Sequence, residues 1–92
     1  MSLVGHWTKL PGDACAERYP ADIEFREATY LAHKGPGQGF LVWDAGMWDE
    51  TGPDRVRIGT ATDELVEYRY ELAGDELRFV DPDGCAFGYQ RS

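Results

Sequence analysis

The sequence predicts an all-β fold, a small eight-stranded antiparallel up-and-down barrel, and the stretch from Leu65 to Arg91 carries most of that prediction. Apolar and polar residues alternate along three runs of this stretch, as they do in a sheet with one dry and one wet face. The runs are separated by Ala73–Asp75 and Asp81–Gly84, which are rich in the Gly and Asp that tight hairpins need. Similar runs recur upstream at roughly ten-residue spacing. Short connections between neighbours favour an up-and-down barrel, whose closure removes exposed sheet edges.

The upstream runs are taken as strands in chain order. They are Leu3–Lys9, Asp22–Arg26, Thr29–Lys34, Phe40–Trp48 and Arg55–Thr60. The run Phe40–Trp48 is expected to form one long strand or a bent pair, with Gly46 as its bulge or bend. Thr51–Asp54 is expected to form the turn that follows it.

Two upstream segments lack strand periodicity. Ala14–Ala21 mixes charges with Cys15 and Pro20, and a short helical turn or an ordered loop would suit it. Gly35–Gly39 holds three glycines and a proline, which break any ladder, so it is expected to form a flexible hairpin tip. It lacks the pattern of a phosphate-binding loop and no helix follows it.

The length, charge and N-terminal residues of the chain limit which partners and locations are expected. Ninety-two residues suit one domain, residues 1–92, and 42% hydrophobic residues are ample for a core. The net charge of −8 disfavours nucleic acid and anionic membranes as partners, because both require a basic surface. Met1–Val4 has neither a basic head nor an apolar run, so no signal peptide is predicted and a cytoplasmic location is expected.

Short motifs give the chain a family resemblance. The first strand contains Gly5-His6-Trp7, a G-x-W, and the last strand ends in Tyr89-Gln90-Arg91. Tyr68–Phe79 follows the pattern YxYxLxGDxLxF, and Asp83–Arg91 follows dG-x-x-x-x-Y-x-R. With these motifs the chain resembles the small bacterial lipocalin-like domains of the calycin barrels. The resemblance implies that Trp7 closes one end of the barrel and that Arg91 packs over it, where a guanidinium on an indole gains about 0.5–2 kcal/mol.

Twelve aromatic residues suggest two functions for such a barrel. Inward rings with tyrosine hydroxyls could line a pocket for a small apolar or aromatic ligand, or they could fill the interior as a packed core. The first hypothesis is therefore a barrel that binds a small apolar or aromatic molecule. The alternative is an interaction module with a filled interior, or a homodimer, anchored by an exposed aromatic residue such as Trp48. Trp43 and Trp48 differ in phase, so one of them is expected at the open mouth. The predicted ligand-binding residues are Trp43, Trp48, Tyr68, Tyr70, Phe79, Phe87 and Tyr89.

The two cysteines are brought near each other by barrel closure. If the last strand pairs with the first, Cys85 lies near Lys9, and Cys15 is a few residues beyond. A disulfide is then geometrically feasible if the two Cα atoms approach within about 7 Å. The alternative is a pair of buried reduced thiols, as expected of a cytosolic protein.

The sequence contains no clear pattern of a catalytic site or a metal site. His6 and His33 lack the dense spacing of metal ligands, and neither cysteine has a nearby histidine. Asp44, Asp49 and Glu50 cannot be told from solvated carboxylates at the rim. An enzyme on a calycin-like barrel would rest on fold analogy alone, so no catalytic residue, metal or cofactor is predicted.

Overall fold

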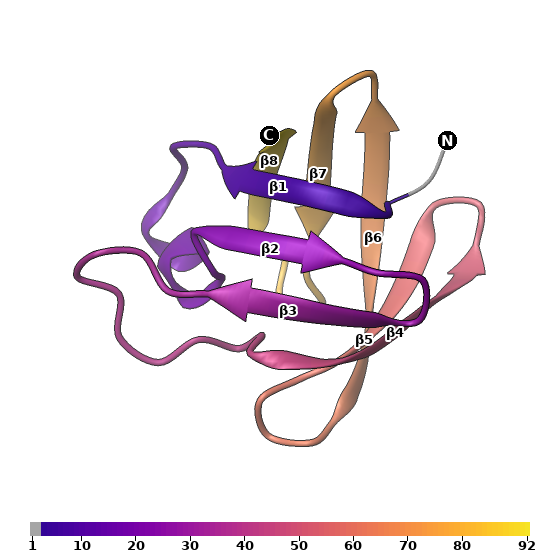
Figure 1. The fold of residues 1–92 in the computed structure, drawn as a ribbon, viewed down its shortest axis with the longest axis horizontal. Helices are drawn as coiled ribbons and strands as arrows, with labels where there is room; N and C mark the ends of the chain where they lie inside the picture. Colours follow the sequence, from indigo (N-terminus) through magenta and orange to yellow (C-terminus); the bar gives the residue numbers. More distant parts are fainter. Residues whose placement is uncertain (1–2) are drawn as a thin grey trace.

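In a computed structural model, described for residues 3–92, the chain forms a closed antiparallel barrel whose eight strands are paired in sequence order (Figure 1). The predicted fold class is thus confirmed. Met1 and Ser2, on which the signal-peptide prediction partly rests, lie outside the described residues. The strands are β1 (Gly5–Lys9), β2 (Asp22–Phe25), β3 (Thr29–His33), β4 (Ala45–Gly52), β5 (Arg55–Gly59), β6 (Leu65–Ala73), β7 (Glu76–Val80) and β8 (Ala86–Arg91).

Closure of the barrel depends on the pairing of β1 with β8. Trp7 lies opposite Arg91 and Lys9 opposite Tyr89, while the other edge of β1 pairs with β2. Figure 1 shows the C-terminal end of β8 beside β1. Every strand therefore has two partners, although β3 pairs with β4 only at Ala45–Met47 and leaves the rest of that edge of β4 outside the ladder.

The alternation read from the sequence matches the two faces of the barrel wall. Along β6, Tyr68 is buried whereas Glu67 and Arg69 are exposed. Along β5, Val56 and Ile58 are fully buried between exposed arginines. The inward rows from all strands meet in one core, because a barrel of this size brings its walls within side-chain reach of each other.

The expected strand Phe40–Trp48 is wrong in its first half. The strand β4 begins at Ala45 and continues to Gly52, through part of the expected turn at Thr51–Asp54. Gly46 pairs regularly with Tyr30, and the register shift of this strand lies between Glu50 and Gly52 instead. Alternation cannot distinguish a strand from a buried loop when both place every second or third residue inside.

Residues 34–44 cross one end of the barrel as a loop. Val42 donates its N–H to the Arg18 carbonyl at 2.7 Å and accepts the N–H of Ala61 at 2.7 Å, so the middle of this loop bonds to other connections. Its last residue, Asp44, accepts the N–H of Ala32 in β3 at 2.8 Å. The loop places Leu41 and Trp43 in the interior. Both Trp43 and Trp48 can therefore be buried without a bulge at Gly46, because Trp43 does not belong to the strand.

The irregular segment Ala14–Ala21 contains a short 3-10 helix, η1 (Ala14–Arg18), which covers the same end of the barrel. Its Ala16 is buried, and Tyr19, just beyond it, points into the core. Among residues 3–92, no helix is long and apolar enough to cross a bilayer.

Candidate functional site

Trp43 lies at the centre of the aromatic interior. Its ring meets those of Tyr19, Tyr68 and Phe79 edge-on, with centroids 5.0–5.1 Å apart. Tyr19 in turn stacks on Phe87 at 3.8 Å. Five of the predicted ligand-binding residues belong to this packed group and are at most 3% exposed. They are Trp43, Tyr68, Phe79, Phe87 and Tyr89. These rings contact one another where the predicted pocket would place a ligand.

The other two predicted ligand-binding residues lie elsewhere. Trp48 is buried, packs edge-on against Phe25, and donates its indole N–H to the backbone carbonyls of Arg26 and Thr29 at 2.8 and 3.0 Å. The expectation that Trp48 is an exposed anchor is wrong, because its place is set by the turn between β2 and β3. Tyr70 is half-buried: it is on the inward face of β6, opposite Phe79, packs against the core from its edge and also lines an open groove.

Trp7 and Arg91 lie together at the end of the barrel where the chain enters. The guanidinium carbon of Arg91 is 4.3 Å from the centroid of the Trp7 ring, and the Trp7 indole N–H donates to the Leu3 carbonyl at 2.9 Å. Arg91 also donates to the Val4 carbonyl at 3.2 Å and pairs with Asp75 at 3.6 Å. This geometry closes that end with a stacked cation.

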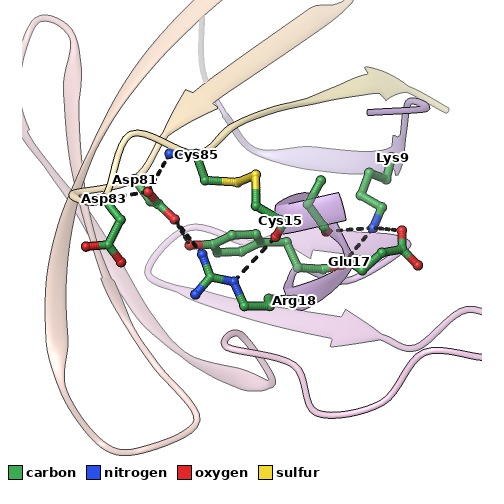
Figure 2. The surroundings of a disulfide bond; sticks show 9 residues. Lys9, Cys15, Glu17, Arg18, Asp81, Asp83 and Cys85 are labelled. Carbon is green, nitrogen blue, oxygen red and sulfur yellow. Dashed lines mark hydrogen bonds and ion pairs between the residues drawn. A yellow bond between two sulfur atoms is a disulfide. The ribbon is translucent and has the colours of Figure 1, made fainter. Parts of the chain in front are cut away.

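A disulfide joins Cys15 of η1 to Cys85, between β7 and β8, at the opposite end (Figure 2). The two Cα atoms are 6.1 Å apart, inside the usual range for a disulfide. The bridge ties η1 to the barrel wall, so this end is covered by η1 and by residues 34–44.

Asp81 is a buried carboxylate that the sequence analysis left without a role. It is 5% exposed and accepts the Tyr19 hydroxyl at 2.7 Å and the Arg18 guanidinium at 3.4 Å. Its second oxygen accepts the backbone N–H groups of Asp83 and Cys85 (Figure 2). The sequence does carry a signal for this role of Asp81. An Asp at the start of an Asp-Pro-Asp-Gly turn accepts a hydrogen bond from the backbone N–H two residues further on.

Among the side chains of residues 3–92, the indole nitrogen of Trp43 is buried without a hydrogen bond of ordinary geometry. Its polar neighbour is the Tyr68 hydroxyl, and the indole N–H opposes the rise in the pKa of Tyr68 that burial causes. A buried unpaired donor costs about 1–3 kcal/mol. The packing of the Trp43 ring must therefore outweigh this cost.

All five tyrosines have a raised pKa. Burial is the largest cause for Tyr19, Tyr30, Tyr68, Tyr70 and Tyr89, and the Asp81 carboxylate that accepts the Tyr19 hydroxyl adds to the effect at Tyr19. The neutral phenols are anchored by bonds such as those from Tyr89 to the Pro20 carbonyl at 2.7 Å and from Tyr30 to the Gly59 carbonyl.

We expect the free energy of unfolding to fall as the pH rises above about 10, the pKa of tyrosine in an unfolded chain. The unfolded chain then loses phenolic protons that the folded barrel retains, so tyrosine burial stabilises the protein fully below that pH and progressively less above it. Denaturant titrations followed at increasing pH, with tyrosinate absorbance as a second signal, measure this. Free ionisation of all tyrosines in a folded protein would contradict it.

The histidines and rim carboxylates occupy the outside of the barrel. The Nε2 atom of His6 lies 3.0 Å from Oδ1 of Asp22, and the two side chains are 48% and 40% exposed. Asp49 pairs with Arg57 at 3.1 Å. In the part of the chain that the structure describes, no three His, Cys, Asp or Glu side chains are grouped as metal ligands would be.

Two open grooves lie on the outer surface along β6 and β7, with volumes of about 680 and 380 Å³. Arg69 and Val80 line both of them. These grooves could not be predicted from the sequence, in which the outward positions of β5 to β7 have the pattern of a solvated face. The sequence hint for the grooves is that arginines recur at the outward positions of β5, β6 and β7.

Comparison of the chain with protein-family models, with curated proteins and with solved structures returns no significant match.

Proposed function

We propose that the protein is a non-enzymatic interaction module, a compact lipocalin-like barrel with a filled interior that binds a partner protein through its outer face. The observation that carries the proposal is the contact between the interior rings. Trp43 meets four other rings at centroid distances of 5.0–5.5 Å, so the apolar surface around it is covered by other side chains of the protein. Binding then depends on what the outside presents.

The outer face of β4, β5 and β6 presents an apolar row. Met47 and Leu65 are 67% and 64% exposed and flank Gly59, which lies opposite Leu65 and against the Met47 backbone. Because glycine has no side chain, the row is flat at its centre. Large apolar side chains that protrude from a rigid sheet beside arginines are typical of the centre of a protein interface.

The test compares the wild type with the double variant Met47→Ser, Leu65→Ser as bait for proteins of the native cell. We expect a protein retained by the wild type to be lost from the double variant, with the melting temperature nearly unchanged because both side chains are exposed. Val4→Ser, which removes an apolar side chain of 45% exposure before β1, is the matched control. Equal retention by wild type and double variant would exclude this face. If the retained protein is a second copy of the chain, light scattering will show a dimer that the double variant lacks.

Ligand binding in the interior is the second candidate, favoured by the unpaired indole nitrogen of Trp43. Trp43 sits on a loop and not on a strand, so a ligand that offers an acceptor could replace it beside Tyr68. Titration with neutral apolar probes that carry an acceptor oxygen (decanol and 2-undecanone) separates the candidates. A saturable shift of the Trp43 indole N–H resonance would favour the carrier, and an unchanged resonance favours the filled module.

The cytoplasmic location stays a prediction, and the disulfide weighs against it. Disulfides persist in oxidising compartments and are rare where glutathione keeps thiols reduced. Trapping of free thiols in intact cells, before lysis, decides between a bonded and a reduced pair at Cys15 and Cys85.

A further inference from the structure

Arg69 differs from the other arginines of the chain. Within residues 3–92, each other arginine pairs with a carboxylate at 3.9 Å or less, and Arg69 has no ion pair. Its side chain lies between the two outer grooves, which share Arg69 and Val80 as lining residues. The exposed guanidinium is therefore free to meet a ligand from either groove.

The register of the sheet brings a second positive charge beside Arg69. Arg55 lies directly opposite it on β5, and Val80 lies opposite it on β7. Like charges at directly opposed positions destabilise a pair of strands. Arg55 is partly neutralised by Glu67 at 3.4 Å and by Asp54 at 3.9 Å, which leaves the charge of Arg69 without compensation. An anion bound at Arg69 would remove the repulsion.

The surroundings limit what that anion can be. Glu67, Glu71 and Asp54 also line the grooves, and the whole chain carries a net charge of −8, so a polyanion would be repelled. Apolar surface lies beside the guanidinium, from Val80, which is 38% exposed, and from Pro53 and Pro82 in two turns. A single carboxylate beside an apolar group matches this pattern, since guanidinium binds carboxylate with two parallel hydrogen bonds.

We infer that the paired outer grooves bind a segment of a partner protein that offers one carboxylate to Arg69 and an adjacent apolar side chain to Val80. The inference rests on the proposed function and specifies its partner. It extends the contact face from the apolar row at Met47 and Leu65 along β6 to Arg69.

Two capped peptides that differ in one charge test the inference. The probes are acetyl-Leu-Glu-Leu-amide and acetyl-Leu-Gln-Leu-amide, titrated into the ¹⁵N-labelled protein. We expect the Glu peptide to shift the Arg69 side-chain Nε–H and the Val80 amide, and the Gln peptide to bind about tenfold more weakly, as loss of a charge-assisted bond implies. Equal affinity for both peptides would overturn the inference.

Two variants locate the site. Arg69→Gln should weaken binding of the Glu peptide about tenfold, and Arg26→Gln, which removes an exposed ion-paired arginine after β2, should leave it unchanged. Equal effects of the two variants would overturn the groove as the site. Peptide shifts confined to Met47 and Leu65 would also overturn the groove but leave the proposed function standing, whereas shifts at the Trp43 indole would argue against the proposed function itself.

Discussion

Trp43→Ala is expected to lower the free energy of unfolding by about 3–5 kcal/mol, the usual cost of removing a large buried ring. Trp43 is 0% exposed and meets the rings of Tyr19, Tyr68, Phe79 and Phe87, so its removal leaves a cavity. The last three of these rings are held by β6, β7 and β8. Strands cannot collapse inward to fill such a space without breaking the closed ladder. Urea denaturation followed by circular dichroism measures the loss.

Trp43→Phe is the control for this prediction. Phe keeps a ring in the same place and removes the indole N–H that lacks a partner. Because an unsatisfied donor costs about 1–3 kcal/mol, its removal should offset much of the lost volume. We expect this variant to fall within about 1 kcal/mol of the wild type. If Trp43→Ala were as mild as Trp43→Phe, the interior would not be packed around this residue, and ligand entry at that position would become the better hypothesis.

The barrel itself could be predicted because strand alternation and turn residues agree along most of the chain. In β6 and β7 the exposed and buried positions follow a period of two, and Gly74 and Gly84 adopt the positive φ of 61° and 88° that their turns require. The pairing of Trp7 with Arg91 follows once the barrel closes, because it needs only the first and last strands. Such features depend on local residue order.

The covered end of the barrel could not be predicted in the same way. The burial of Trp43 depends on residues 34–44 crossing the barrel, which is set by bonds from Val42 to Arg18 and Ala61. These hydrogen bonds join segments that are far apart in the chain, so no periodic pattern in the sequence indicates them. The outer grooves were missed for a related reason, since the opposition of Arg55 to Arg69 depends on the register of two strands. Sequence alternation tells which side a residue faces, but not which residue stands beside it.

Replacing both cysteines with alanine is expected to lower the free energy of unfolding by about 4 kcal/mol. Cys15 and Cys85 are 70 residues apart, and a crosslink of this length removes much of the freedom of the unfolded chain. The folded barrel should change little, because Tyr19 and Asp81 still hold the same end through their hydrogen bond at 2.7 Å. We expect the urea midpoint to fall and the m value to rise, since an unfolded chain without the crosslink exposes more surface.

Reduction of the wild type provides the matched comparison, because it breaks the same bond without changing the side chains. An unchanged midpoint after reduction would mean that the bond does not form in solution. A loss of about 4 kcal/mol would be a large part of the roughly 5–15 kcal/mol by which domains are stable. The barrel would then be marginal wherever thiols are kept reduced, and its acidic surface would not compensate, because self-repulsion at a net charge of −8 opposes compaction. Stability with and without the bond therefore bears directly on the compartment in which this barrel can function.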